Sequence, residues 1–138
     1  MAAMHDYPAK AHENLAGAES ELQHVQHGRT NSCARSAYYA CFHAAIAALL
    51  HAGLTAQEPS RGWGHGWVHA SFVGQLIQCR KLYSANLRRS LPDLLALRHK
   101  GDYRATRVSQ REAQQAVRSA QTLVQAVTAH LQREEGSA

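Results

Sequence analysis

Residues 30–53 read TNSCARSAYYACFHAAIAALLHAG, and this segment carries apolar side chains on two sides at helical spacing. The two apolar stripes are Ala34, Tyr38, Cys41, Ala45 and Ala48 on one side, and Tyr39, Phe42, Ile46 and Leu49 on the other. Thr30 or Asn31 can cap the start and Gly53 can end the helix, so we expect a helix over about residues 31–52. A helix that is apolar this far around lies at the centre of a bundle or across a subunit interface.

Further helical patterns stand on both sides of this segment. Residues 8–27 repeat small and apolar side chains at helical spacing (Ala11, Leu15, Ala18, Leu22 and Val25), and a third helix is indicated by Val68, Phe72, Leu76 and Cys79. The clearest pattern starts at a capping box of Ser109 and Glu112. Its apolar stripe contains Ala113, Ala116, Val117, Ala120, Leu123, Val124, Val127 and Leu131. No stretch alternates with period two long enough for a strand, so we expect an all-α fold, an antiparallel four- to five-helix up-and-down bundle.

The length of 138 residues suits one domain, which we assign to residues 1–133, with a flexible tail at 134–138. The loop at residues 54–66 contains Trp63, with Trp67 just beyond it, and we expect it to fold back on the bundle. Stacking of these tryptophans on nucleic-acid bases is the alternative. Three cysteines lack the close pairing of a zinc knuckle or redox motif, so Cys33, Cys41 and Cys79 are interpreted as reduced core residues.

Charge is unevenly distributed along the chain. The formal net charge is +5. Residues 80–118 hold ten Lys or Arg against Asp93, Asp102 and Glu112, whereas in residues 1–30 the acidic side chains outnumber the basic ones. A polyanion, an acidic partner and a self-complementary dimer each fit this polarity, as does a solvated arginine-rich surface. No apolar run approaches a membrane span and no secretory signal is visible, so we expect a soluble, cytoplasmic protein without a membrane partner.

A short helix near residue 98 carries an unusual arginine. Ser90 is a suitable cap with Asp93 three residues later, and Gly101 is the predicted stop. Counting back from Arg98 by four and seven residues gives Leu94 and Leu91, so Arg98 continues a buried stripe. Burying an unpaired guanidinium costs on the order of several kcal/mol. Arg98 therefore needs a carboxylate, a hydroxyl, a subunit boundary or a bound anion.

The segment RSAYYACFHAA at residues 35–45, His65 with Phe72, and Arg98 followed by Asp102 and Tyr103 together resemble the HEPN superfamily, in particular its small stand-alone prokaryotic members. The resemblance covers about residues 10–130. It implies an antiparallel helical bundle that dimerises and acts in toxin–antitoxin or antiviral defence modules, in many members as a metal-independent ribonuclease. Other members are inactive RNA-binding or scaffolding modules, and small ones work with a nucleotidyltransferase partner. No cofactor is implied.

In the ribonuclease members, the resemblance implies, an arginine is followed after four to six residues by a histidine. Arg98 matches the arginine, but residues 103–105 are Tyr103, Arg104 and Ala105, so the histidine is missing. Tyrosine, with a pKa near 10, is a poorer base than histidine at neutral pH. We therefore predict a catalytic set in which Tyr103 donates a proton, Arg98 stabilises the phosphorane charge and Asp102 orients one of them. The alternative is an internal salt bridge between Arg98 and Asp102 with Tyr103 packed beside it.

Other basic residues and histidines are secondary candidates. The predicted RNA- or phosphate-binding residues are Arg35, His99, Lys100, Arg104 and Arg107. For Arg35 a cross-helix pair with an acidic residue is the favoured alternative, and for His99 and Lys100 it is compensation of the helix dipole. His65 and His69 are four residues apart, but no further ligands complete a metal site, so we favour a structural role for His65 and predict no metal. His43 is a candidate to replace the missing histidine.

Three candidate functions follow. The first is a HEPN homodimer of a toxin–antitoxin or defence module that engages RNA or nucleotide phosphate at a dimer groove and cleaves RNA without metal. The second is a catalytically inactive scaffold or regulatory subunit that assembles with a nucleotidyltransferase or another effector, with Tyr103 as a target for modification by that partner. A histidine-based metal enzyme is the third and weakest.

Overall fold

The computed structural model describes residues 6–23, 30–55, 62–103 and 107–136, and of Tyr103 it describes the backbone. The α-helices are α1 (Asp6–Leu22), α2 (Thr30–His51), α3 (His65–Ser71), α4 (Ser90–Tyr103) and α5 (Gln110–Gly136). A π-helix, η3 (Phe72–Cys79), continues α3, and a short 3₁₀ turn, η4 (Ala85–Leu87), precedes α4. Over these ranges the chain contains no strand, so the predicted all-helical bundle is confirmed.

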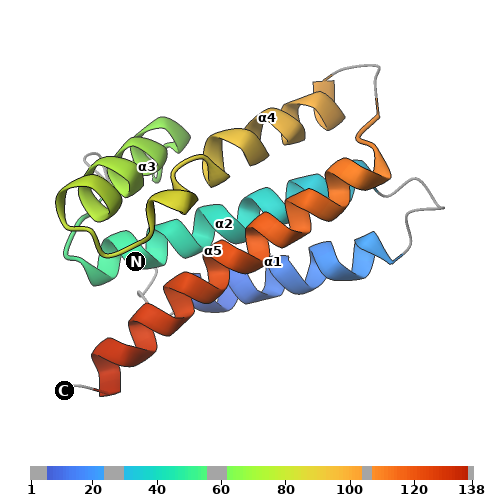
Figure 1. The fold of residues 1–138 in the computed structure, drawn as a ribbon. Coiled ribbons are helices and arrows are strands. Elements are labelled where there is room, and N and C mark those ends of the chain that lie inside the picture. The colour runs from blue at the N-terminus through green and yellow to red at the C-terminus, as the bar shows by residue number, and fades with distance from the viewer. Residues whose placement is uncertain (1–5, 24–29, 56–61, 104–106, 137–138) are drawn as a thin grey trace.

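Helix α2 is the centre of the bundle (Figure 1). Its two apolar stripes are buried, from Ala34 and Tyr38 on one side to Phe42 and Ile46 on the other, except that Tyr39 is partly buried. Helices α1, α4 and α5 all pack against it, and α3 with η3 covers the end near His51. Because α2 is enclosed this far around, the residues that project from it at the α3 and α4 side are held in fixed positions.

Helices α1 and α5 bury most of the predicted stripes; Leu22 and Leu131 are partly buried, and Val25 lies outside the described residues. Ala11, Leu15 and Ala18 are buried on α1, and the thiol of Cys33 on α2 donates to the carbonyl of Ala18 at 3.3 Å. The predicted capping box of α5 is present: the Ser109 hydroxyl accepts from the Glu112 amide at 3.0 Å, and Glu112 Oε1 accepts from the Ser109 amide at 2.9 Å. Helix α5 continues to Gly136, beyond the predicted domain boundary at residue 133.

The third helix differs from its prediction at its C-terminal end. Cys33 and Cys41 are buried as expected, but Cys79 is exposed, so its assignment to the core was wrong. The cause is the π-helical winding of η3, in which the Arg80 amide donates to the Gln75 carbonyl five residues back, at 2.9 Å. This wider winding turns Ile77 towards the core beside Leu76 and turns Cys79 outwards.

Helix α4 passes through the predicted stop. Gly101 lies inside the helix, where a Cβ atom would come 3.1 Å from the side chain of Asn31 at the start of α2. Asn31 Nδ2 donates to the Gly101 carbonyl at 3.0 Å, and its Oδ1 accepts from the Val108 amide at 2.9 Å. The glycine is thus needed for a close helix contact rather than for a helix end.

The two tryptophans pack on the bundle. Trp63 and Trp67 are both partly buried against the core, with ring centroids 5.6 Å apart, and the Trp63 ring meets Tyr7 of α1 edge-on at 6.3 Å. This matches the expected return of the loop, although residues 56–61 of it lie outside the described ranges. Across the described helices, none combines the length and the apolar character that crossing a membrane requires.

Candidate functional site

Arg98 lies on α4 with its guanidinium group over the aromatic side chains of α2. Its side chain is 17% exposed, and its Nε donates to Asp102 Oδ2, one turn later, at 3.3 Å. The guanidinium carbon stands 4.8 Å from the centre of the Tyr39 ring and 5.8 Å from that of Tyr38, within the range of cation–π attraction. The predicted need of Arg98 for a partner is therefore confirmed, and the carboxylate is that of Asp102.

Asp102 joins two arginines from two helices. Its Oδ1 accepts from Nη2 of Arg35 on α2 at 2.6 Å, so each carboxylate oxygen holds one guanidinium. The hydrogen bond from Arg35, supported by Arg98, holds the pKa of Asp102 below its usual range, and the carboxylate is ionised at neutral pH. The cross-helix pair expected for Arg35 is confirmed. Asp102 of α4 thus connects Arg98 of its own helix with Arg35 of α2, and these three residues form the Arg98 cluster.

Two histidines of α3 lie on the same aromatic surface. The hydroxyl of Tyr38, a fully buried residue of α2, is hydrogen-bonded to Nδ1 of His65 at 2.5 Å and to Nε2 of His69 at 2.8 Å. The His65 ring stacks on Phe42 at 4.7 Å between centroids. Since a tyrosine hydroxyl has one proton, at most one of the two histidines accepts from it, and at least one donates to it.

Both histidines are held neutral. Burial lowers the pKa of His65, and the charges of Arg98 and His99 lower it further. Burial and then His65 lower the pKa of His69. Burial raises the pKa of the Tyr38 hydroxyl, which therefore keeps its proton. In the part of the chain that the structure describes, no group of three or more His, Cys, Asp or Glu side chains is arranged to hold a metal.

His43 is bonded to a side chain of α1 rather than to the histidines of α3. Its Nδ1 is 3.3 Å from Nδ2 of Asn14, and its ring stacks on Tyr39 at 6.0 Å. Burial lowers the pKa of His43, with Lys10 of α1 as the next cause. The charge that acts on His43 thus comes from α1, whereas the charge of Arg98 acts on His65.

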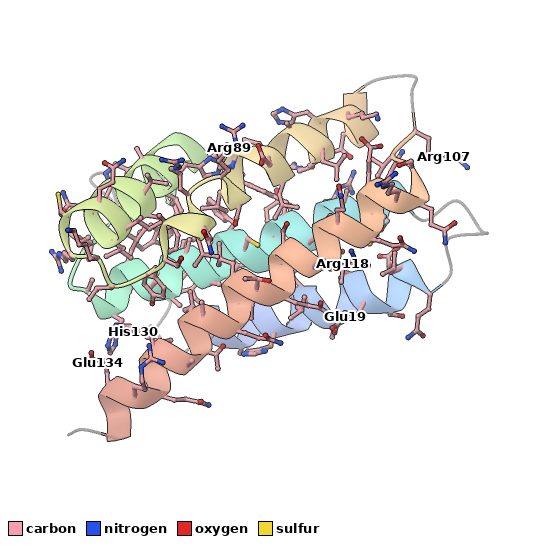
Figure 2. All side chains as sticks on the ribbon, viewed as in Figure 1. Glu19, Arg89, Arg107, Arg118, His130 and Glu134 are labelled. Carbon is pink, nitrogen blue, oxygen red and sulfur yellow. The ribbon has the colours of Figure 1, made fainter. Side chains whose placement is uncertain are left out.

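The predicted phosphate-binding residues separate into two groups. Arg35 lies with Arg98, since both bind Asp102, and His99 is the next residue of α4 after Arg98. Lys100 instead pairs with both oxygens of Glu112, at 2.9 and 3.0 Å, at the start of α5. Arg107 is exposed ahead of α5, at the end of the bundle where α4 and α5 are connected (Figure 2). Arg104 and the side chain of Tyr103 lie outside the described residues.

Tyr38, His65 and His69 were not among the predicted site residues. The spacing of His65 and His69 is visible in the sequence, where a structural role for His65 was favoured over half of a metal site. Their shared partner is a tyrosine on α2, and the sequence gives no spacing rule for a contact between helices this far apart in the chain. The neighbouring pair Tyr38 and Tyr39 was the one available signal.

The comparison with known families agrees with this architecture. The HEPN domain profile matches residues 4–131, which is nearly the whole chain. No curated protein matches the sequence. Since one family profile spans every helix around the Arg98 cluster, the chain belongs to the HEPN domain family.

Proposed function

We propose that this HEPN protein binds RNA or nucleotide phosphate at Arg98, in a groove between the two subunits of a homodimer, as part of a cytoplasmic toxin–antitoxin or antiviral defence module. The observation that carries the proposal is the placement of the Arg98 guanidinium, whose Nε is bonded to Asp102 and whose carbon lies 4.8 Å from the centre of the Tyr39 ring. Dimerisation is common among HEPN domains.

The geometry of Arg98 suits a phosphate ligand. Its Nε is engaged by Asp102, and within the described ranges no further ion pair is made by its two terminal nitrogens. A guanidinium that is already fixed at one edge by a carboxylate and on one face by an aromatic ring loses little further conformational freedom when it binds an anion. Terminal N–H groups in this arrangement bind phosphate oxygens with directional, charge-assisted hydrogen bonds.

The inactive scaffold is the second candidate. Its support is that the same contacts brace α4 against α2: Arg98 and Arg35 satisfy Asp102 from two helices, and Arg98 covers the Tyr39 ring. In this case Arg98 stabilises the fold, and the nucleic-acid chemistry belongs to a nucleotidyltransferase or another effector.

RNA binding by a matched pair of variants separates the two candidates. Arg98→Gln and Arg118→Gln each remove one positive charge, and Arg118 is an exposed residue on α5 (Figure 2), whereas Arg98 lies on α4. With labelled tRNA in fluorescence anisotropy, we expect Arg98→Gln to raise Kd about tenfold or more, which corresponds to about 1.4 kcal/mol, and Arg118→Gln about twofold. The affinity of the unchanged protein for tRNA is expected to fall steeply between about 50 and 200 mM salt. Binding releases counterions from the phosphates that it neutralises, and added salt opposes this release.

Circular dichroism and gel filtration are the folding controls. Equal Kd values for the two variants, in dimers that remain folded, would remove Arg98 from the binding site. The scaffold role would be established if Arg98→Gln fails to fold and the unchanged protein does not bind RNA.

A further inference from the structure

We propose that His65 is the general base for metal-independent RNA cleavage at Arg98, and that the Tyr38 hydroxyl and His69 are positioning residues that orient its ring. This inference rests on the proposed binding of RNA phosphate at Arg98 and names the chemistry of that site. In this proposal His65, on α3, takes the role of the histidine that is missing from the sequence after Arg98.

The first step is proximity. Arg98 and His65 come from α4 and α3, and both side chains lie on the aromatic surface that α2 presents there. Arg98 stands 4.8 Å from the centre of the Tyr39 ring, and the centre of the His65 ring is 6.5 Å from that same centre and 5.5 Å from that of Tyr38. The charge of Arg98 also acts directly on the titration of His65. A phosphate held by Arg98 is thereby placed next to the imidazole.

The second step is the choice of ring nitrogen. Nδ1 of His65 faces the Tyr38 hydroxyl, so Nε2 is the nitrogen available to a substrate. With the proton of His65 on Nδ1, this N–H donates to the Tyr38 oxygen, and the Tyr38 O–H donates to Nε2 of His69. This direction of the relay leaves a lone pair on Nε2 of His65, which is the form that a general base requires.

The third step is the protonation state. The groups that face His65 are Tyr38, Tyr39 and Phe42 of α2, His69 of its own helix, and Arg98 and His99 of α4. Neither a carboxylate nor a thiolate is among the charges that shift it. Burial and the two basic residues lower its pKa, so the imidazole is neutral at pH 7, whereas the phenol of a tyrosine such as Tyr103 is ordinarily protonated there.

The reaction balances without a co-reactant other than water. Nε2 of His65 takes the proton from a ribose 2′-hydroxyl, and the oxygen electron pair forms the bond to the adjacent phosphorus. The bond between phosphorus and the 5′-oxygen breaks, and the leaving oxygen takes a proton from water. The resulting hydroxide takes the proton back from Nε2. The products are a 2′,3′-cyclic phosphate and a 5′-hydroxyl end, and Arg98 stabilises the additional negative charge on the phosphorane oxygens.

The test compares His65→Gln with His43→Gln in the full-length protein, with labelled tRNA and EDTA. His43 is a matched control because it is also a half-buried histidine beside Tyr39, but its nitrogen faces Asn14. We expect His65→Gln to bind tRNA within about twofold of the unchanged protein and to cleave it about 100-fold or more slowly. Because the sequence also makes His43 a candidate for the missing histidine, cleavage that is lost in His43→Gln and kept in His65→Gln would overturn the assignment of His65. The products are identified by mass spectrometry, which reports the cyclic phosphate directly.

The positioning residues have a separate readout. Tyr38→Phe removes the hydroxyl that fixes the His65 tautomer, so the acidic limb of the pH–rate profile moves while binding is retained. Nitrogen-15 spectra of the imidazoles in the unchanged protein provide a measurement that does not depend on a variant folding. We expect the Nδ1–H tautomer for His65, and an Nε2–H tautomer at neutral pH would overturn the assignment.

The outcomes distinguish this inference from the proposed function. Binding without cleavage by the unchanged protein, or equal cleavage by His65→Gln, overturns His65 as the base and leaves phosphate binding at Arg98 intact. Absence of both binding and cleavage overturns both proposals.

Discussion

At the scale of single residues, Asp102 is the side chain on which the cluster depends. Asp102→Asn removes the negative charge that pairs with both Arg35 and Arg98. The Arg98 side chain is only 17% exposed. We expect the free energy of unfolding to fall by about 1–3 kcal/mol, because a poorly solvated guanidinium loses its counter-charge. Asp93→Asn is the control, since its pair with Arg89 is exposed, and it is expected to cost less than about 0.5 kcal/mol in the same urea titrations. Equal costs would show that the cluster contributes no more than a surface ion pair.

The same residues mark how far sequence reasoning reaches into the site. Arg98 and Asp102 are one helical turn apart, so their pairing follows from spacing alone. For Arg35, the sequence predicts that an arginine on a central helix pairs with an acidic residue of another helix, but it does not identify that residue as Asp102. The contact between Tyr38 and His65 could not be predicted, because it depends on how α3 packs against α2, and no local sequence pattern determines that packing.

At the scale of helices, Gly101 tests the contact between α4 and α2. Alanine in a helix is ordinarily more stable than glycine by about 1 kcal/mol. At position 101 the added Cβ would lie 3.1 Å from Asn31, which two hydrogen bonds hold in place, so we expect Gly101→Ala to destabilise the protein by about 1–3 kcal/mol. Gly17→Ala on α1 is the control, because the nearest atom there is the Ser36 hydroxyl at an ordinary 3.8 Å. It is expected to raise the thermal midpoint, and a rise for both variants would contradict the tight contact.

The helices also separate what the sequence encodes locally from what it does not. The stripes of α2 and α5 and the capping box at Ser109 depend on residues within a few positions of one another, and these predictions were confirmed. Cys79 was assigned to the core by counting with an α-helical period, and the π-helical turns of η3 change that period. Gly101 was read as a helix end because its tertiary neighbour, Asn31, is 70 positions away.

At the scale of the whole molecule, the titrating groups combine to make the fold sensitive to acid. Burial lowers the pKa of His43, His65 and His69 from 6.5, so the unfolded chain binds more protons than the folded one as pH falls below about 6.5. Their stabilising contribution is complete above that pH and is lost as pH falls through the folded-state values. The lowered pKa values of Asp102 and Glu112 add a second loss below about pH 4. Thermal midpoints between pH 8 and pH 3, read by circular dichroism, are therefore expected to decline in two stages. The double variant His65→Gln with His69→Gln is expected to reduce the first stage to the part that His43 contributes and to leave the second unchanged. An unaltered first stage would show that His65 and His69 are not held neutral by the fold.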